Sequence, residues 1–179
     1  MHLETDRLVL RPLSWDDLDD MFEFHSHAEV AKYNTIGIPS DKEVTRGIIR
    51  AAIEDQSNSI RSIYGWTVRL KDTNEFIGET GISSSNNRFK RAEIHYHISY
   101  DRWGQGYATE VAQRLIAFGF ETLKLHRIEA GVATNNEGSI RVLEKSGMIR
   151  EGLRRKILPI RGKWHDNYMY AILEDDFSQ

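Results

Sequence analysis

The residues best suited to bind a charged group lie between Trp103 and Thr109, where two glycines precede a predicted helix. Gly104 and Gly106 permit a tight turn, and the small Ala108 lets a ligand approach the backbone closely. The first N–H groups of a helix have no partner within it, and the helix dipole is positive at that end. Phosphate groups bind to such helix starts. The segment therefore predicts a site for a phosphate-bearing ligand, although the glycines also fit a simple tight turn.

Two common nucleotide motifs do not match this segment. A dinucleotide-binding motif has Gly or Ala three residues after its second glycine, whereas Thr109 occupies that position. It also favours a continuously apolar strand early in the chain, whereas the strand before Trp103 alternates and lies in mid-chain. A P-loop needs Gly-Lys followed by Ser or Thr, which the segment lacks. The phosphate compound is therefore of another kind.

Glu93, His95 and His97 alternate along the strand that precedes the glycine segment. Alternate residues of a strand share one face, so these side chains form a titratable row in which Glu93 and His95 are candidate proton acceptors, and we select Glu93. Two histidines at this spacing also suggest a metal, but no third ligand accompanies them, and we expect no metal. His165 and Asp166, in the last predicted hairpin, and a chain of waters are alternative bases.

Composition limits the possible partners of the chain. Its 179 residues, 40% hydrophobic and 28% charged, are typical of one globular domain, which we expect to span residues 1–179. The net charge of −3 gives no overall attraction to nucleic acid. No apolar run approaches the roughly 18 residues of a membrane span, and residues 1–6 do not resemble a secretory signal. The absence of cysteine excludes disulfides and permits the cytoplasm, where we expect the protein.

The elements that must position these side chains follow from apolar periodicity. Strands are expected over residues 7–13, 63–70, 76–82, 92–99 and 127–133, and a hairpin over residues 150–173 that turns near Arg161 and Gly162. Helices are expected over residues 14–31, 41–54, 108–123 and 137–146. This order predicts an α+β domain, a mixed sheet with helices on both faces.

Charged runs accompany the first helix and the last hairpin. The acidic run is interpreted as a solvated face, or as a surface that attracts a cationic amine; it contains Asp16, Asp17, Asp19, Asp20 and Glu23. The basic run is interpreted as a charged hairpin face, or as contacts to phosphate; it contains Arg150, Arg154, Arg155, Lys156 and Arg161.

Several ordered motifs together resemble the GNAT superfamily of N-acetyltransferases, and in particular its RimJ/RimL-type branch. Residues 103–110 resemble the acetyl-CoA motif of that superfamily, Gln/Arg-x-x-Gly-x-Gly/Ala. Gly106 and Ala108 fill its last two positions, whereas Trp103 replaces the usual Gln or Arg. The other motifs that are similar to the branch lie at residues 4–12, 92–96, 127–130, 136–139 and 143–148.

The resemblance implies a mixed, mostly antiparallel central sheet whose fourth and fifth strands, residues 92–99 and 127–133, splay apart to hold CoA. The pantetheine arm would lie in the gap, and N–H groups from Gln105 to Thr109 would hold the pyrophosphate. The residues expected to bind acetyl-CoA are Tyr96, His97, Ile98, Trp103, Gly104, Gln105, Gly106, Tyr107, Ala108, Thr109, Asn136 and Ser139.

The implied reaction is attack of a neutral amine on the acetyl thioester. It needs a base, donors for the oxyanion, and an acid for the leaving thiolate. Backbone N–H groups around Tyr96 to Ile98 are the expected donors. Many members of the family carry a Tyr in the helix after the fifth strand, where this chain has Leu143. Ser139 resembles the residue that meets the CoA sulfur in the RimL-like branch, although it also fits an ordinary first helical turn capped by Asn136.

The function implied is acetyl transfer to a primary amine. The acceptor would be a protein N-terminal amine, such as that of a ribosomal protein, or a small amine such as a polyamine or an amine-bearing antibiotic. In the family it is selected by residues 14–57, by the loop 83–91 and by the last hairpin. The alternative is a catalytically idle acyl-CoA-binding or regulatory domain. We expect a monomer or a homodimer, with no nucleic acid and no membrane among its partners.

Overall fold

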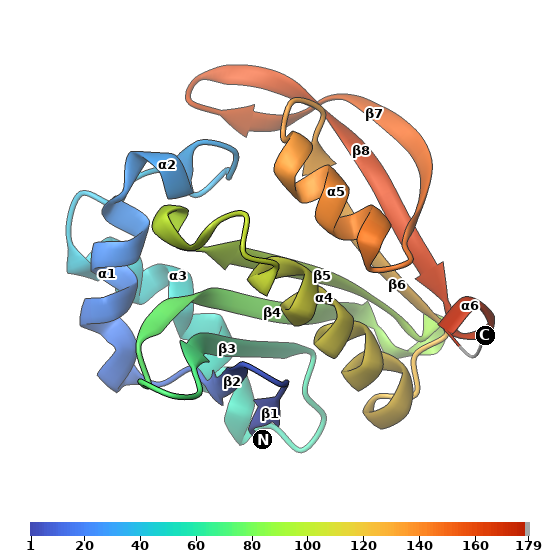
Figure 1. Ribbon diagram of the computed structural model, residues 1–179, viewed down its shortest axis with the longest axis horizontal. Coiled ribbons are helices and arrows are strands. Elements are labelled where there is room, and N and C mark those ends of the chain that lie inside the picture. Colours follow the sequence, from blue (N-terminus) through green and yellow to red (C-terminus); the bar gives the residue numbers. More distant parts are fainter. Residues whose placement is uncertain (178–179) are drawn as a thin grey trace.

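The computed structural model describes residues 1–177, and within residues 85–87 it describes the backbone alone. Its strands are β1 (Leu3–Glu4), β2 (Leu8–Pro12), β3 (Ile63–Leu70), β4 (Phe76–Asn86), β5 (Arg91–Ile98), β6 (Arg127–Ala133), β7 (Ile149–Ile160) and β8 (Lys163–Leu173). Its α-helices are α1 (Leu18–Ser26), α2 (Ala28–Ala31), α3 (Lys42–Glu54), α4 (Tyr107–Ala117), α5 (Glu137–Lys145) and α6 (Glu174–Phe177). Figure 1 shows how they surround the sheet.

The strands form one sheet in the order β1-β2-β3-β4-β5-β6-β8-β7. Every neighbouring pair is antiparallel except β5 and β6, which are parallel. This confirms the predicted mixed, mostly antiparallel sheet. The parallel pair is short: it begins at Arg91 with Arg127 and ends at Glu93 with Glu129. In the described chain, residues 94–98 and 130–133 continue these strands without pairing to each other, so the strands part as predicted.

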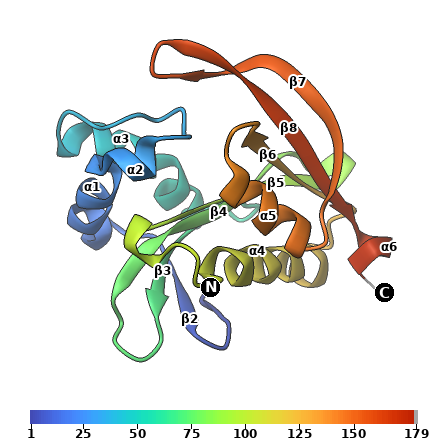
Figure 2. The same cartoon turned by 45° about the horizontal axis from the view of Figure 1, so that its top comes forward.

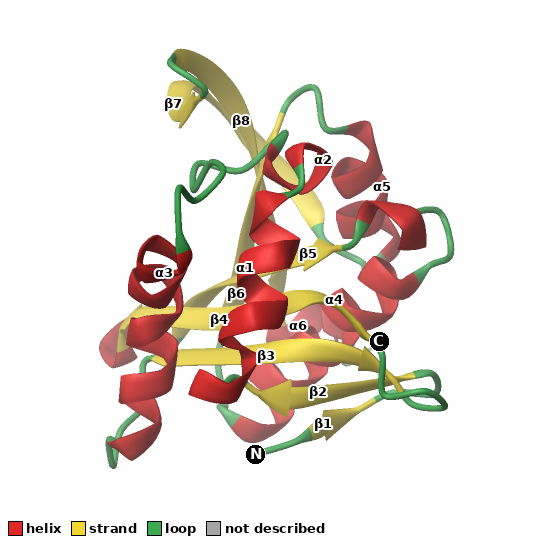
Figure 3. Cartoon of the chain, turned by 90° about the vertical axis from the view of Figure 1, so that its left-hand side faces the viewer, coloured by secondary structure: helices red, strands yellow, loops and turns green. Residues whose placement is uncertain are grey.

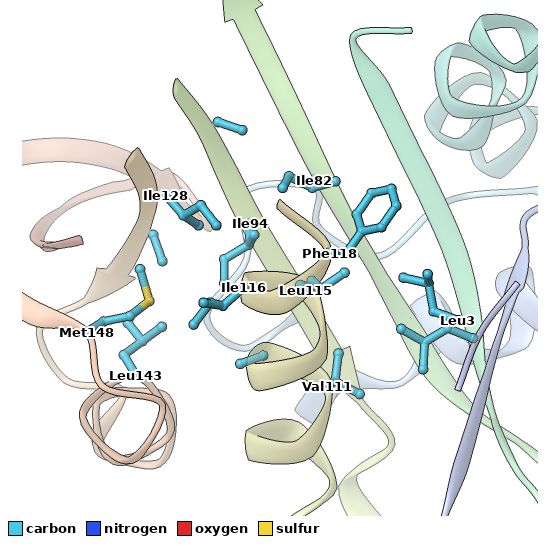
Figure 4. Packing of buried hydrophobic residues seen from close by; sticks show 14 of the residues in the cluster. Leu3, Ile82, Ile94, Val111, Leu115, Ile116, Phe118, Ile128, Leu143 and Met148 are labelled. Atoms are coloured by element: carbon cyan, nitrogen blue, oxygen red, sulfur yellow. The ribbon is translucent and has the colours of Figure 1, made fainter. Parts of the chain in front are cut away.

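Helices α4 and α5 cover one face of the sheet (Figures 1 and 4). The predicted stripe of α4, which includes Val111, Leu115 and Ile116, is buried against strand residues such as Ile94 and Ile128. Burial of such side chains contributes about 1.5–3 kcal/mol each. This apolar core fixes α4 along β5, so that its N-terminus lies at the open end of the gap between β5 and β6.

Helices α1 and α3 pack on the opposite face of the sheet, as Figure 3 shows. Leu13, Leu18, Met21 and Ile49 form a second buried cluster there. The cluster leaves the part of this face over β5 and β6 free for polar side chains. The prediction of helices on both faces is confirmed.

The predicted helix over residues 14–31 is wrong as one element. A 3₁₀ turn at Trp15–Asp17 leads into α1, and His27, with φ of −75° and ψ of 123°, separates α1 from α2. An extended residue cannot continue the helical hydrogen bonds, so the chain turns there. The break allows α2 to lie close to the last hairpin rather than to continue along α1 (Figure 1).

The interpretation of the acidic run as a solvated face is also wrong at Asp17. This carboxylate is fully buried and pairs with Arg69 at 3.1 Å and with Arg11. Burial would raise its pKa, but hydrogen bonds from Ser14 and the bond and charge of Arg11 together lower the pKa of Asp17 below its ordinary value. Asp17 is therefore a structural anchor between the first turn and β3.

The other predicted elements are present within a few residues, except that the helix predicted over residues 108–123 is α-helical only to Ala117 and continues as a π-helix over Phe118–Thr122. Asp41 caps α3 by accepting the N–H groups of Glu43 and Val44. The last hairpin turns at Arg161 and Gly162, as expected. The short β1 and α6 were not predicted, and β4 runs beyond its predicted end. Within residues 1–177, no helix is long and apolar enough to cross a membrane.

Candidate functional site

Gly106 is the N-cap of α4 and has a φ of +85°. Gly104, two residues earlier, has a φ of +75°. Such left-handed backbone favours glycine, because a Cβ is strained there. No side chain caps this helix start, so the first N–H groups of α4 remain available for a ligand. This geometry fits the predicted phosphate site.

An arginine from the N-terminal segment fixes the glycine turn. Arg7 Nη1 donates to the carbonyl oxygen of Gln105 at 3.0 Å, and Arg7 Nη2 lies 2.6 Å from Glu110 Oε2. The same guanidinium lies 4.4 Å from the centroid of the Tyr107 ring. Burial would raise the pKa of Glu110, but hydrogen bonds from Thr5 and Arg7 lower it. Sequence reasoning missed this role of Arg7, since 98 residues separate it from Gln105.

Trp103 joins the glycine turn to the end of β5. Its indole Nε1 donates to the carbonyl oxygen of Ile98 at 2.7 Å, while 47% of the side chain stays exposed. The residue that departs from the family motif therefore holds Ile98 and the helix start at a fixed spacing.

The gap between β5 and β6 presents a free strand edge. Tyr96 and His97 pair with Thr80 and Glu79 of β4, whereas their other edge has no partner in β6 within the described residues. An unpaired edge offers N–H and C=O groups to an extended ligand. Tyr96, His97 and Ile98, around which the oxyanion donors are expected, thus lie on the strand that borders the gap.

Ser139 lies beside this gap. The hydroxyl oxygens of Ser139 and Tyr96 are 2.8 Å apart, and Asn136 Oδ1 accepts the Ser139 N–H at 3.2 Å. Asn136 is therefore the N-cap of α5, as predicted. Burial raises the pKa of Tyr96 strongly, although its bond to Ser139 opposes the shift. Leu143, where the family resemblance suggested that a Tyr might act, is only 1% exposed and belongs to the core.

The row of titratable side chains on β5 faces away from α4. Glu93 is exposed on one side, but desolvation by the protein and the nearby charge of Glu129 raise the pKa of its carboxyl. The charges of Arg154 and Arg91 and the N–H of Gly131 oppose that rise. His95 is also open to solvent on one side. Desolvation of its ring by the surrounding protein lowers its pKa to about 4, and the charge of Glu79 opposes this shift. This environment favours the neutral imidazole of His95 and makes the Glu93 carboxylate a stronger base than an ordinary carboxylate.

His97, the third member of that row, belongs to a buried cluster with Glu79 and His25. Glu79 is 8% exposed, and its Oε1 lies 2.8 Å from His25 Nε2 and 3.3 Å from His97 Nδ1. Burial would raise the pKa of Glu79, but hydrogen bonds and charge from the two histidines hold it well below its usual range. The imidazole of His97 is thereby directed toward Glu79.

The alternative bases lie on the hairpin. Asp166 Oδ1 accepts the backbone N–H of Lys156 at 2.8 Å. His165 lines a cavity of about 310 Å³ between α2 and the hairpin, together with Lys32, Tyr33, Asn135, Ile160, Arg161 and Lys163. Among the described residues, no group of three or more His, Asp or Glu side chains is placed to hold a metal ion.

The predicted site residues therefore gather at one end of the sheet. Residues 96–98 and 103–109 form one wall of the gap, and Asn136 and Ser139 lie beside it on α5. Glu93 lies at the fork, on the opposite face from Ser139. Besides Arg7, sequence reasoning missed the pairing of Glu79 with His25, because the two residues belong to different elements. The inward orientation of Tyr96 was predictable, because Tyr96 alternates along β5 with the row of titratable side chains on the opposite face.

Comparison with known proteins agrees with this geometry. Residues 7–149 match the family described as "Acetyltransferase (GNAT) domain". The chain is 34% identical over 180 residues, 98% of each chain, to "Uncharacterized N-acetyltransferase p20" of Bacillus licheniformis. It resembles a solved GNAT-family acetyltransferase from Bacillus anthracis with a TM-score of 0.85 and 31% identity, covering 98% of this chain and 99% of that one.

A second solved structure resembles the chain in fold alone. The spermidine N-acetyltransferase from Vibrio cholerae, in complex with CoA and spermine, has a TM-score of 0.85 and 20% identity. The match covers 98% of this chain and 100% of that chain.

Proposed function

Because the chain belongs to the acetyltransferase (GNAT) family and is an acetyl-CoA-dependent N-acetyltransferase, we propose that it acetylates a primary amine of a protein N-terminus or of a small molecule. The observation that carries the proposal is the fork between β5 and β6 beside the uncapped start of α4. We assign residues 1–179 to one catalytic domain. The motifs at residues 4–12 and 143–148 favour the RimJ/RimL-type branch.

In this proposal the glycine turn holds the pyrophosphate of CoA. The N–H groups from Gln105 to Thr109 lie at the start of α4, where the helix dipole favours negative charge. Arg7 donates to the Gln105 carbonyl oxygen and so stabilises the turn. The free edge of β5, residues 94–98, would pair with the pantetheine arm as a strand pairs with its neighbour.

The same edge stabilises the developing oxyanion. Backbone N–H groups near Tyr96 to Ile98 are rigid, because β4 holds the other edge of β5. Fixed donors that face developing charge lower the barrier without reorganisation, and each such donor contributes about 10²–10³-fold to turnover.

Ser139 supplies the proton to the leaving thiolate. Tyr96 stays protonated because its pKa is raised, so it can donate its own hydroxyl hydrogen to Ser139 Oγ. The hydrogen of Ser139 is then free to point at the sulfur. The pair replaces the single Tyr that the family often carries in α5.

Glu93 accepts the proton of the incoming ammonium. Its raised pKa makes it a better base than an ordinary carboxylate, and His95 beside it is too weak a base to compete. Glu93 and Ser139 lie on opposite faces of the sheet, so the amine can approach from one face while the thiolate leaves toward the other.

The test is CoA release on mixing the protein with acetyl-CoA and a panel of amines, with the acetylated product identified by mass spectrometry. We expect release that depends on the amine. Tight CoA binding with no turnover on any amine would instead indicate an idle acyl-CoA-binding domain.

A further inference from the structure

We propose that the acceptor amine belongs to a molecule that also carries an anionic group, a carboxylate or a phosphate, and that the cavity between α2 and the β7–β8 hairpin binds this group. The inference rests on the proposed function, because it names the class of acceptor for the same site. The cations that would bind the anion are Lys32, Arg161 and Lys163.

The cavity lies at the end of the sheet where β5 and β6 part. Asn135, one of its walls, follows the last residue of β6, Ala133, by two positions. His165, another wall, precedes Asn167 by two positions, and Asn167 is the β8 partner of Ala133. The cavity is therefore adjacent to the open end of the gap.

Both walls of the cavity are fixed in place. Arg161 Nη2 donates to the carbonyl oxygen of Ala28 at 2.9 Å, which joins the hairpin tip to α2. Figures 1 and 2 show the tip of this hairpin on the side of α2. The guanidinium is thus held at the rim, where its remaining N–H groups can meet an anion in a planar, bidentate manner.

The lining is one-sided in charge. Three of its seven residues are Lys or Arg, a fourth is His165, and none of the described lining residues is acidic. Asp166, next to His165, directs Oδ1 to the backbone N–H of Lys156. The volume of about 310 Å³ accommodates a short side chain or a carboxylate-bearing tail.

This charge discriminates among amines. A polyamine would bring further positive charges toward three cations, whereas an acidic peptide or an amino acid would bring complementary charge. Solvent-exposed charge pairs change binding by up to about five-fold each. Their attraction weakens with salt, because the screening length is about 10 Å at 0.1 M ionic strength.

The experiment compares kcat/KM for peptides of one length that differ only at positions two and three, as Asp-Asp, Asn-Asn or Lys-Lys. A second pair, 5-aminovalerate and cadaverine, asks whether a small amine with a carboxylate suffices. We expect the acidic member of each set to be preferred by about five-fold or more, and the preference to shrink at high salt. Preference in the peptides alone would identify a peptide source.

Lys163→Glu and Lys32→Glu should reduce or reverse the preference. Lys124→Glu is the matched control, because it makes the same charge change at an exposed position beside the opposite end of β6. Active enzyme without an acidic preference, or a preference that Lys163→Glu leaves unchanged, would overturn this inference and leave the proposed function intact.

Equilibrium binding of the same peptides to the CoA-bound protein gives a result that does not depend on turnover. Tighter binding of the acidic peptide, lost in Lys163→Glu, supports the inference even if no amine is acetylated. Equal binding of the three peptides contradicts it.

Discussion

The hydroxyl oxygens of Tyr96 and Ser139 lie 2.8 Å apart, so the open end of β5 and the first turn of α5 are joined by side chains. Tyr96 comes from the strand that offers its free edge, and Ser139 from the helix that covers the other side of the gap. In the proposed reaction this pair supplies the hydroxyl donor for the leaving thiolate, because Leu143 of α5 is apolar and buried in the core.

Ser139→Ala should lower kcat by about 10²-fold, the smaller end of the usual effect of a general acid. The dissociation constant for acetyl-CoA should change little, because backbone N–H groups make most of the expected contacts. Tyr96→Phe should lower kcat less, since it leaves the Ser139 hydroxyl in place. Steady-state kinetics and calorimetric CoA binding check both variants. An unchanged kcat in Ser139→Ala would remove Ser139 as the acid.

Gly106→Val should weaken CoA binding by 10-fold or more, about 1.4 kcal/mol. A β-branched residue is strained at the φ of +85°, and its side chain would lie at the helix start where the pyrophosphate is expected. Isothermal calorimetry with CoA measures the change, with Gly152→Val as the matched glycine control. Equal affinities in the two variants would place the phosphates elsewhere.

Asp17→Asn should destabilise the fold by about 3 kcal/mol, because it leaves the mostly buried Arg69 without one of its ionic partners. Asp16, its neighbour, is exposed, so Asp16→Asn should change the free energy of unfolding by no more than about 0.5 kcal/mol. Urea unfolding of both variants gives the comparison. Similar midpoints would mean that the buried pair adds no net stability.

Glu79 predicts a specific dependence of stability on pH. Its folded pKa is held below the unfolded value of 4.5 by His25 and His97, although burial opposes the shift. The folded state therefore gains stability that is fully present above pH 4.5 and is lost as the pH falls toward the folded pKa. Thermal unfolding of Glu79→Gln should show a shallower loss below pH 4.5 than the natural chain. Parallel curves for the two proteins would contradict the assignment.

The fold and the local geometry of the glycine turn and of the start of α5 were largely predictable from local signals. The glycine turn precedes an amphipathic helix, Asn136 caps the next one, and alternation marks β3 and β5; each of these is visible within about ten residues. The break at His27 was not visible, because the pattern of α1 and α2 reads as one helix. It depends on tertiary packing, in which His25 is buried against Glu79.

Partners far apart in the sequence account for the remaining errors. Asp17 looked like part of a solvated run because Arg69 is 52 residues away. Arg7 and Gln105 come together only through the sheet. The cavity lined by Lys32, Arg161 and Lys163 lies between α2 and the last hairpin. No local pattern in either segment indicates this cavity.

Hydrogen–deuterium exchange with and without CoA, read by mass spectrometry, tests the proposed CoA site most directly. We expect slower exchange in residues 94–98 and 105–109, the free edge of β5 and the start of α4, while residues 42–54 of α3 stay unchanged. Protection confined to other segments, with residues 94–98 and 105–109 unaffected by saturating CoA, would contradict the proposed site.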